Sequence, residues 1–329
     1  MRSYLFKIGN FELRIYSLMY ILAFVIGIYI ASKDIVAKKR GIKDKKLIED
    51  FAFWSMISGL LGARLYYVLL KFSYYMDNPL SILRVWEGGL AIHGGIIGGL
   101  IGSYLYAKKN KLNLWVLTDV AVGPLIFGQF LGRFGNLANG EIHGFPTFTP
   151  LKVILSGKFN EWWYAYQNMS LEAQNKFREL VPWGVVFPED TPAGLEFPGY
   201  PLHPAMMYES ILNLIGFILL WFFFRKKEYN IGVLSMIYLI MYAIIRVIVS
   251  TFRVEDLLVY GIRAPYLISI AMIIFAIIGI LIVSLITYFN PISGGDSVNI
   301  ADLNFGLAMY ILLAGAIAIC AMVLPGISG

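Results

Sequence analysis

The feature that most constrains this chain is a series of eight apolar runs, each about as long as a helix that crosses a bilayer. Such a helix needs roughly 20 apolar residues to cross about 30 Å of hydrocarbon. Composition agrees, because 58% of the residues are hydrophobic, 15% are charged and the mean hydropathy is +0.69. The sequence therefore predicts an all-α, polytopic membrane protein. The runs lie near residues 16–32, 51–71, 88–107, 113–131, 204–224, 231–249, 264–288 and 304–324.

The basic residues are concentrated in alternate short loops, which predicts the orientation of the chain in the membrane. Lysines and arginines crowd residues 33–46, 108–111 and 225–227, after the first, third and fifth runs. Cytoplasmic loops of membrane proteins carry an excess of these residues. The N-terminus and the long loop 133–203 are therefore expected outside. The net charge of +6 is explained by these loops beside the membrane and does not indicate nucleic-acid binding. A cleaved signal peptide is the alternative interpretation of residues 1–32, although its charge should precede the apolar run.

Two segments outside the apolar runs suggest further organisation. Residues 158–180 mix aromatic with charged side chains, which is typical of one or two helices lying at the membrane surface. Residues 289–303 have the composition of a polar linker that leads to the last run. The chain thus divides into a seven-span domain, 1–288, that includes the outer loop, and a segment 289–329 of unknown role, for which a fused fragment is one interpretation.

Cysteine and histidine usage argues against a disulfide framework or a metal centre. The single cysteine, Cys320, lies in the last apolar run, so no intramolecular disulfide can form. The three histidines, His93, His143 and His203, are not spaced as zinc ligands usually are. No metal and no cofactor is therefore expected.

Four polar side chains fall inside or at the end of apolar runs, close to the predicted outer surface. At a rise of about 1.5 Å per residue, His93 and Glu209 each lie about 7 Å below that surface. Arg133 closes the fourth run, and Arg246 lies in the outer half of the sixth. Ionisable side chains at membrane depth cost about 2.5–3.5 kcal/mol and are therefore functional candidates. Their common depth predicts one site, open toward the outer leaflet, in which two guanidiniums face a histidine and one or two carboxylates.

Each of these features also has a purely structural interpretation. Gly94 and Gly98 belong to overlapping small-xxx-small patterns, whose commonest use is close helix packing. His93 is as well explained by a hydrogen bond between helices, and Glu209 by a bond to a neighbouring side chain. Arginines on the helix face of Arg246 can extend to the membrane surface.

Two guanidiniums in a partly dry cavity leave two classes of function open. They suit bidentate recognition of a phosphate or carboxylate, which fits an enzyme acting on a lipid phosphodiester or a transporter of a small anion or phospholipid. A transporter would need polar residues in the inner halves of its spans and broken helices near the midplane. Segments 211–224 and 231–242 are apolar, and a one-sided cavity favours the enzyme.

The segment GRFGNLANGEIHG (132–144) resembles the signature of the bacterial prolipoprotein diacylglyceryl transferases. These polytopic enzymes attach diacylglycerol to the lipobox cysteine of secreted lipoprotein precursors. The resemblance covers about residues 10–288, and its spaced blocks keep the family's order, which makes it specific. The further blocks are RIYSLMY (14–20), GARLYYV (62–68), WEGGLAIHGG (86–95), VPWGVVFP (181–188), HPAMMYE (203–209) and YAIIRVIVSTFRVED (242–256).

The resemblance implies a reaction and the residues that perform it. The diacylglyceryl group of phosphatidylglycerol moves to a cysteine thiol of the prolipoprotein, which forms a thioether and releases glycerol phosphate. The thiol, with an ordinary pKa near about 8.5, needs a base; His93 is expected in that role, with Glu209 as the alternative. The expected catalytic residues are His93, Arg133, Arg246, Glu209 and Glu141, and those expected to bind phosphatidylglycerol are Arg133, Asn136, Asn139, Arg246, Tyr16 and Tyr242.

Two positions depart from the family pattern. Ser250 stands where the family usually has Glu, and Met206 stands where it often has Gln. The first change removes a carboxylate from the helix face of Arg246, so either that carboxylate is dispensable or Arg246 is positioned differently here. The implied partners are phosphatidylglycerol and the signal peptide of a prolipoprotein with its lipobox cysteine, and no nucleic acid. The implied location is the bacterial cytoplasmic (inner) membrane, with several passes, the N-terminus outside and the site open to the outer leaflet.

Overall fold

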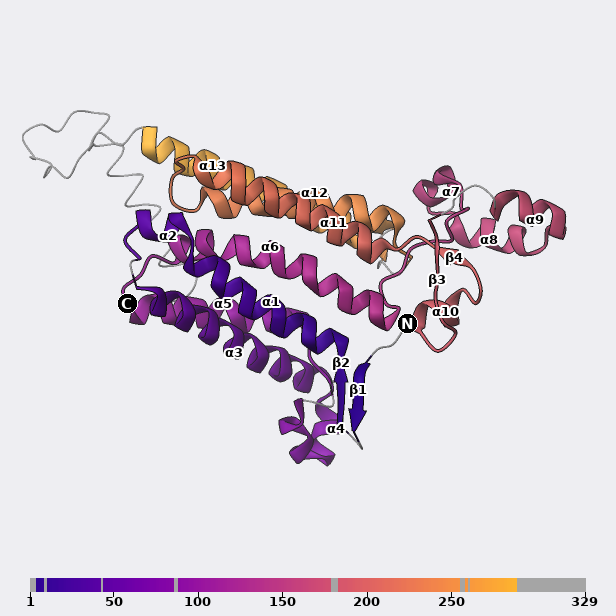
Figure 1. Ribbon diagram of the computed structural model, residues 1–329, viewed down its shortest axis with the longest axis horizontal. Helices are drawn as coiled ribbons and strands as arrows, with labels where there is room; N and C mark the ends of the chain where they lie inside the picture. Colours follow the sequence, from indigo (N-terminus) through magenta and orange to yellow (C-terminus); the bar gives the residue numbers. More distant parts are fainter. Residues whose placement is uncertain are drawn as a thin grey trace, which may run out of the picture.

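The long helical segments of the described residues run side by side along the molecule (Figure 1). The computed structural model describes residues 4–8, 11–42, 44–85, 88–178, 183–254, 258–259 and 261–288. The segments are α1 (Ile15–Ser32), α3 (Lys45–Leu70), α5 (Ile92–Lys109), α6 (Leu114–Asn139), α11 (Ala205–Ile218), α12 (Val233–Phe252) and α13 (Ala264–Tyr288). All except α5 are long and apolar enough to cross a membrane, with α11 counted through its continuation to Lys226. The prediction of an all-α polytopic membrane protein is confirmed, and the run at 304–324 lies outside the described residues.

Two helix boundaries differ from the prediction, and both affect the site. The α6 helix does not end near residue 131 but continues through Asn139, so the outer loop begins at Gly140. Gly140 ends the helix in the left-handed conformation (φ 65°), which glycine adopts without strain. The α5 helix begins only at Ile92, so His93 lies in its first turn and not five residues along a helix.

Glycines allow α3 and α5 to approach backbone to backbone. A Cβ at Gly98 would lie 2.9 Å from Gly62 Cα and would collide with the carbonyl oxygen of Ser58, while a Cβ at Gly94 would collide with the carbonyl oxygen of Gly62. In a membrane, small residues at such crossings let helices gain van der Waals contact. The predicted packing role of Gly94 and Gly98 is therefore confirmed.

Replacing Gly98 with alanine should loosen this helix pair. The added Cβ meets backbone atoms that cannot rotate away, so we expect the free energy of unfolding to fall by about 1–3 kcal/mol. A matched control is Gly132→Ala on α6, where a Cβ would meet no atom within 4 Å. Thermal unfolding in detergent measures both variants, and equal midpoints would contradict the close packing.

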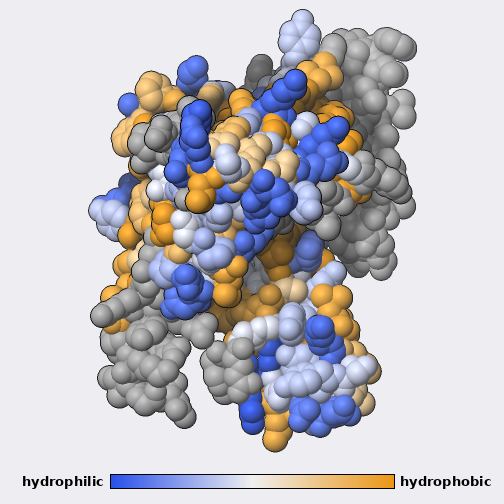
Figure 2. All heavy atoms as spheres, turned by 90° about the vertical axis from the view of Figure 1, so that its right-hand side faces the viewer, coloured by the Kyte–Doolittle hydropathy of each residue, from blue (hydrophilic) through white to orange (hydrophobic). Residues whose placement is uncertain are grey.

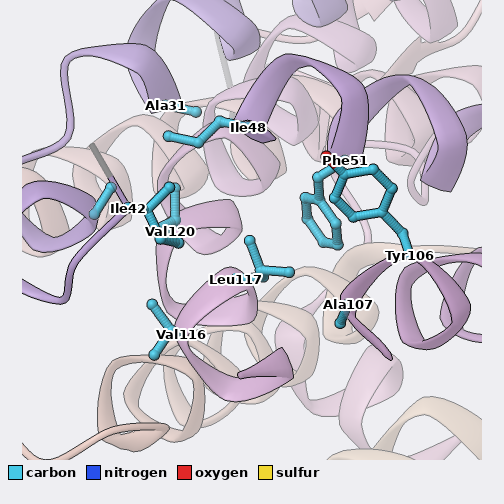
Figure 3. Close-up of a cluster of buried hydrophobic side chains, with 10 residues drawn as sticks. Ala31, Ile42, Ile48, Phe51, Tyr106, Ala107, Val116, Leu117 and Val120 are labelled. Carbon is cyan, nitrogen blue, oxygen red and sulfur yellow. The ribbon is translucent and has the colours of Figure 1, made fainter. Parts of the chain in front are cut away.

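A buried apolar cluster holds the end of the bundle that is predicted to be the inner one (Figure 3). Its side chains come from α1, the segment that follows it, α3, α5 and α6. Close packing of such side chains stabilises the contact between helices through van der Waals attraction. The members are Ala31, Ala37, Ile42, Ile48, Phe51, Tyr106, Ala107, Val116, Leu117 and Val120.

A buried charged network lies at the inner ends of α6, α11 and α12. The carboxylate of Asp119 accepts hydrogen bonds from the backbone nitrogens of Gly232 (2.8 Å) and Ser235 (2.9 Å) at the start of α12, and it pairs with Arg40. Arg225 donates from Nε to Asp34 (3.2 Å), the residue that caps α2 (Ile35–Lys39). The Asp119 side chain on α6 therefore caps the start of α12.

The outer loop folds into a small subdomain at the other end of the bundle. The described part of segment 158–180 contains two helices, α8 (Phe159–Gln167) and α9 (Leu171–Arg178), as predicted. Their aromatic side chains pack into a core of their own, in which Tyr166 is buried against Phe148 and Trp162. Figure 2 views this end, where hydrophilic side chains lie among hydrophobic ones.

Short elements complete the outer end (Figure 1). Three two-stranded antiparallel sheets pair β1 with β2, β3 with β4 and β5 with β6. The remaining elements are β1 (Tyr4–Ile8), β2 (Phe11–Arg14), α4 (Phe72–Asp77), η1 (Pro79–Leu83), α7 (Leu151–Ser156), β3 (Val185–Val186), α10 (Pro192–Glu196), β4 (Pro201–Leu202), β5 (Leu258–Val259) and β6 (Ile262–Arg263).

Candidate active site

The last two turns of α6 supply the first part of the candidate site. Arg133, Asn136 and Asn139 follow one another at intervals of three residues and share a helix face. The left-handed turn at Gly140 then reverses the chain, and the backbone nitrogen of Glu141 donates to the carbonyl of Asn136 (3.0 Å). As a result the Glu141 carboxylate lies beside the side-chain amides of Asn136 (3.4 Å) and Asn139 (3.3 Å).

A buried carboxylate lies between two guanidiniums at the centre of the site. Glu209, in the first turns of α11, is 0% exposed and pairs through Oε1 with Nη2 of Arg133. Its second oxygen, Oε2, lies 4.0 Å from Nη1 of Arg246 on α12. The arginine side chains remain 20% and 18% exposed, so part of each guanidinium is accessible. The accessible parts of the two guanidiniums present planar sets of hydrogen-bond donors that suit an anion.

A hydrogen-bonded chain extends from this centre toward the outer loop. Arg133 Nη1 donates to Asn136 Oδ1 (3.2 Å), and the other end of the same amide faces Glu141. The Asn136 amide therefore separates the Glu141 carboxylate from the guanidinium of Arg133. These contacts join six of the residues that the sequence predicted for one site into a single connected cluster. Its members are Arg133, Asn136, Asn139, Glu141, Glu209 and Arg246.

Two predicted tyrosines lie beside this cluster. Tyr16 at the start of α1 packs directly over Gly135, where a Cβ would lie 2.6 Å from its ring, and its hydroxyl is 2.7 Å from that of Tyr20. Because Gly135 has no side chain, Tyr16 can pack against α6 between Arg133 and Asn136. Tyr242 lies one turn from Arg246 on α12, and its ring stacks on Tyr238 with centroids 6.2 Å apart.

His93 lies on a different pair of helices from the cluster. It is exposed in the first turn of α5, and its ring lies against Tyr66 of α3, with centroids 6.1 Å apart. Among the described residues, the hydrogen bonds and ion pairs of the cluster do not extend to it. That His93 acts in this site stays a prediction.

The two other histidines hold the outer loop in place. His143 is buried, and its Nε2 lies 3.1 Å from the Glu196 carboxylate. His203 Nδ1 lies 2.9 Å from the hydroxyl of Tyr208 on α11, and its backbone exchanges hydrogen bonds with residues 144 and 145 (2.8 and 2.9 Å). Within the described part of the chain, no three His, Cys, Asp or Glu side chains gather as metal ligands would.

The free energy of unfolding should fall in mild acid because His203 is buried in its neutral form. Burial lowers the pKa of His203 to about 4, from an ordinary value of 6.5. Between these two values the unfolded chain binds the proton and the folded protein does not, so stability is full above about pH 6.5 and decreases as the pH falls toward 4. The loss should reach about 3 kcal/mol. Thermal unfolding of His203→Gln, compared with the parent protein from pH 7 to 4, should show a weaker pH dependence, and identical profiles would contradict this assignment.

The two positions that depart from the family pattern are both buried. Met206 packs into the apolar core of the outer subdomain, beside Phe145 and Leu202, where an apolar side chain fits. Ser250 is buried one turn beyond Arg246, and its backbone carbonyl accepts a hydrogen bond from Arg263 (2.8 Å).

A separate cavity of about 430 Å³ lies at the outer ends of α3 and α4. Arg64 lines it but is itself buried, and it donates to the carbonyl oxygens of Ile82 (2.9 Å) and Gly88 (2.6 Å), among others. This arginine therefore fixes the connection between α3 and α5. Its partners are backbone atoms, so the sequence offered no signal for this role.

Sequence reasoning also missed two polar residues next to the cluster. Gln129 and Asn213 lie one helical turn inward from Arg133 and Glu209 respectively. Their spacing of four residues was a visible signal, because residues four apart lie on one helix face.

Comparison with known proteins identifies the family. The family model described as prolipoprotein diacylglyceryl transferase matches residues 3–282. A phosphatidylglycerol–prolipoprotein diacylglyceryl transferase of Fusobacterium nucleatum is 52% identical over 270 residues, 81% of this chain and 93% of that protein. The transferase of the same name from Thermotoga maritima is 32% identical over 281 residues, 85% of this chain and 84% of that protein. The one from Synechococcus elongatus is also 32% identical over 281 residues, 84% of this chain and 85% of that protein. The chain therefore belongs to the prolipoprotein diacylglyceryl transferase family of membrane enzymes.

Proposed function

We propose that this protein transfers the diacylglyceryl group of phosphatidylglycerol to the lipobox cysteine of a prolipoprotein. The observation that carries the proposal is Glu209, buried between Arg133 and Arg246 at the predicted outer end of the bundle. In the reaction the cysteine sulfur forms a bond to the terminal glycerol carbon of the diacylglyceryl group. The bond from that carbon to the phosphate oxygen breaks, and glycerol phosphate leaves with the electron pair.

The guanidiniums are the groups that hold the phosphate in this proposal. Arg133 and Arg246 each carry a fixed positive charge and donate several hydrogen bonds in one plane, which matches phosphate oxygens. Charge builds up on the phosphate as the bond to carbon breaks, and donors placed in advance stabilise it. Glu209 orients both guanidiniums, and Asn136 adds a neutral donor and acceptor beside Arg133.

His93 is the proposed base that takes the thiol proton. A histidine has an ordinary pKa near about 6.5 and accepts protons readily at neutral pH. Glu209, the alternative, is already engaged in an ion pair with Arg133 through Oε1. Proton transfer by His93 requires the thiol to lie between the first turn of α5 and the cluster.

The proposed location is the bacterial inner membrane, with the N-terminus and the site on the outer side. The positively charged segments around residues 33–46, 108–111 and 225–227 support this orientation through the positive-inside rule. The outer subdomain built on α7–α10 would then face the signal peptide, which approaches within the same leaflet.

A reconstituted assay tests the proposal. The full chain in detergent is mixed with phosphatidylglycerol and a synthetic signal peptide that contains one lipobox cysteine, and the peptide mass is measured. We expect the mass to rise by one diacylglyceryl group, and a peptide with Ser in place of that Cys to remain unchanged. Release of glycerol phosphate without peptide modification would indicate a phospholipase, and uptake of a small anion into proteoliposomes with neither product would favour a transporter.

A further inference from the structure

A second polar layer lies directly beneath the cluster of guanidiniums and carboxylates. We call Gln129 on α6, Asn213 on α11 and Tyr238 and Tyr242 on α12 the neutral layer. Gln129, Asn213 and Tyr242 are each four residues inward from Arg133, Glu209 and Arg246, which corresponds to a step of about 6 Å.

Contacts between the helices place these residues at one level. Gln129 Nε2 donates to the hydroxyl of Tyr238 (2.9 Å), which joins α6 to α12. Ser210 Oγ donates to the carbonyl of Phe130 (3.0 Å), which joins α11 to α6 at the adjacent positions. A Cβ at Gly216 would meet Ile126 of α6 and Met241 of α12, so the three helices remain in contact one turn further in.

The neutral layer carries buried polar atoms that lack hydrogen-bond partners. Asn213 is 0% exposed, and neither its Nδ2 nor its Oδ1 has a partner among the described residues. The same holds for Oε1 of Gln129. Leaving such atoms unpaired is costly, and nearly all buried polar groups in folded proteins are paired with protein, water or ligand.

The unpaired atoms define the chemistry of the group that would satisfy them. Two of the three are oxygens that accept hydrogen bonds, and only the Asn213 amide nitrogen donates. Phosphodiester oxygens and ester carbonyls also only accept, so neither can pair with these oxygens. Hydroxyl groups both donate and accept and carry no charge.

We propose that the neutral layer binds the hydroxyl groups of the glycerol headgroup and thereby selects phosphatidylglycerol among anionic phospholipids. This inference rests on the proposed function and adds a specificity determinant to the same site. The guanidiniums recognise the phosphate, which anionic phospholipids share, while Asn213 and Gln129 recognise the two hydroxyls that distinguish this headgroup. A site built to bind a hydroxyl rejects an analogue without it strongly, because the buried polar groups then remain unpaired.

Phosphatidylpropanol provides the matched substrate for a test. It has the same phosphodiester charge, the same bond to break and a three-carbon headgroup without hydroxyls. We expect the parent protein to use phosphatidylglycerol with a kcat/KM at least about 100-fold higher. Transfer from neither lipid would contradict the proposed function itself, whereas equal use of both would contradict only this inference.

Variants then locate the selectivity. Asn213→Leu should lower kcat/KM for phosphatidylglycerol at least about 10-fold and leave that for phosphatidylpropanol within about 3-fold, because a leucine pairs with no hydroxyl. Gln129→Met provides an independent variant, with the same expected direction, if Asn213→Leu does not fold. Ser210→Ala is the control, since Ser210 is buried on the same helix but already bonded to a backbone carbonyl. An equal loss on both lipids in Asn213→Leu and Gln129→Met would show a merely structural role and overturn the proposal.

Discussion

Arg133→Ala should lower kcat/KM for diacylglyceryl transfer by at least about 1,000-fold, since a single well-placed donor to a developing oxyanion is worth about 100- to 1,000-fold. Two losses add up in this variant. The phosphate loses a guanidinium, and the buried carboxylate of Glu209 loses its closest cation. Arg133→Lys should retain part of the activity, because an ammonium keeps the charge but not the planar pair of donors. Initial rates of peptide modification, measured against phosphatidylglycerol concentration, give these values.

A control distinguishes loss of the site from loss of positive charge at the outer end. Lys71 is an exposed cation near the outer end of α3 and lines the separate cavity there. Lys71→Ala should therefore leave kcat/KM unchanged while the chain inserts normally. Normal activity in Arg133→Ala would refute the role given to this arginine.

His93→Ala should lower kcat by about 100- to 10,000-fold, the usual contribution of a general base. Without the base, the reaction depends on thiols that are already ionised. A thiol with a pKa near about 8.5 ionises further as the pH rises, so the residual rate of the variant should increase steeply from pH 6.5 to 8.5. The parent protein should show a shallower dependence over that range. Single-turnover rates across the pH range measure both.

His93→Gln separates a base from a packing residue. Glutamine keeps a polar side chain of similar length next to Tyr66 but cannot take a proton at this pH. If His93→Gln restores the activity lost in His93→Ala, the histidine acts by packing. In that case Glu209→Gln becomes the decisive variant, because Glu209 is the other candidate base.

The position of a residue along the helix bundle could be predicted from the sequence, but the direction in which its side chain points around the helix could not. The apolar runs fixed the number of long helices within residues 15–288, and helix rise placed Arg133, Glu209 and Arg246 in one layer. Which face of each helix points inward depends on packing between helices that are distant in sequence. The link between Arg133 and Glu209 could be expected from their common depth, whereas the position of His93 beside Tyr66 could not.

Boundaries set by backbone conformation were the other source of error. Residues 132–139 are polar enough to suggest a loop, but polar side chains are compatible with a helix that leaves the membrane. The signal for the true end was Gly140, the residue that turns left-handed and returns Glu141 to Asn136. The inner network around Asp119 escaped prediction because its partners are backbone nitrogens of α12, which no side-chain pattern reveals.

The central claim is that Arg133 and Arg246 hold the phosphate of one lipid between them, and nuclear dipolar coupling measures this directly. The protein is labelled with ¹⁵N in its arginine guanidiniums and given one equivalent of phosphatidylglycerol in a detergent without phosphorus, and the ¹⁵N–³¹P coupling is recorded. Hydrogen bonds of about 2.8 Å from nitrogen to phosphate oxygen place nitrogen within about 4 Å of phosphorus. Strong coupling should appear in the parent protein, weaken in Arg133→Lys and in Arg246→Lys, and disappear in the double variant. Coupling that is unchanged in the double variant would contradict the claim.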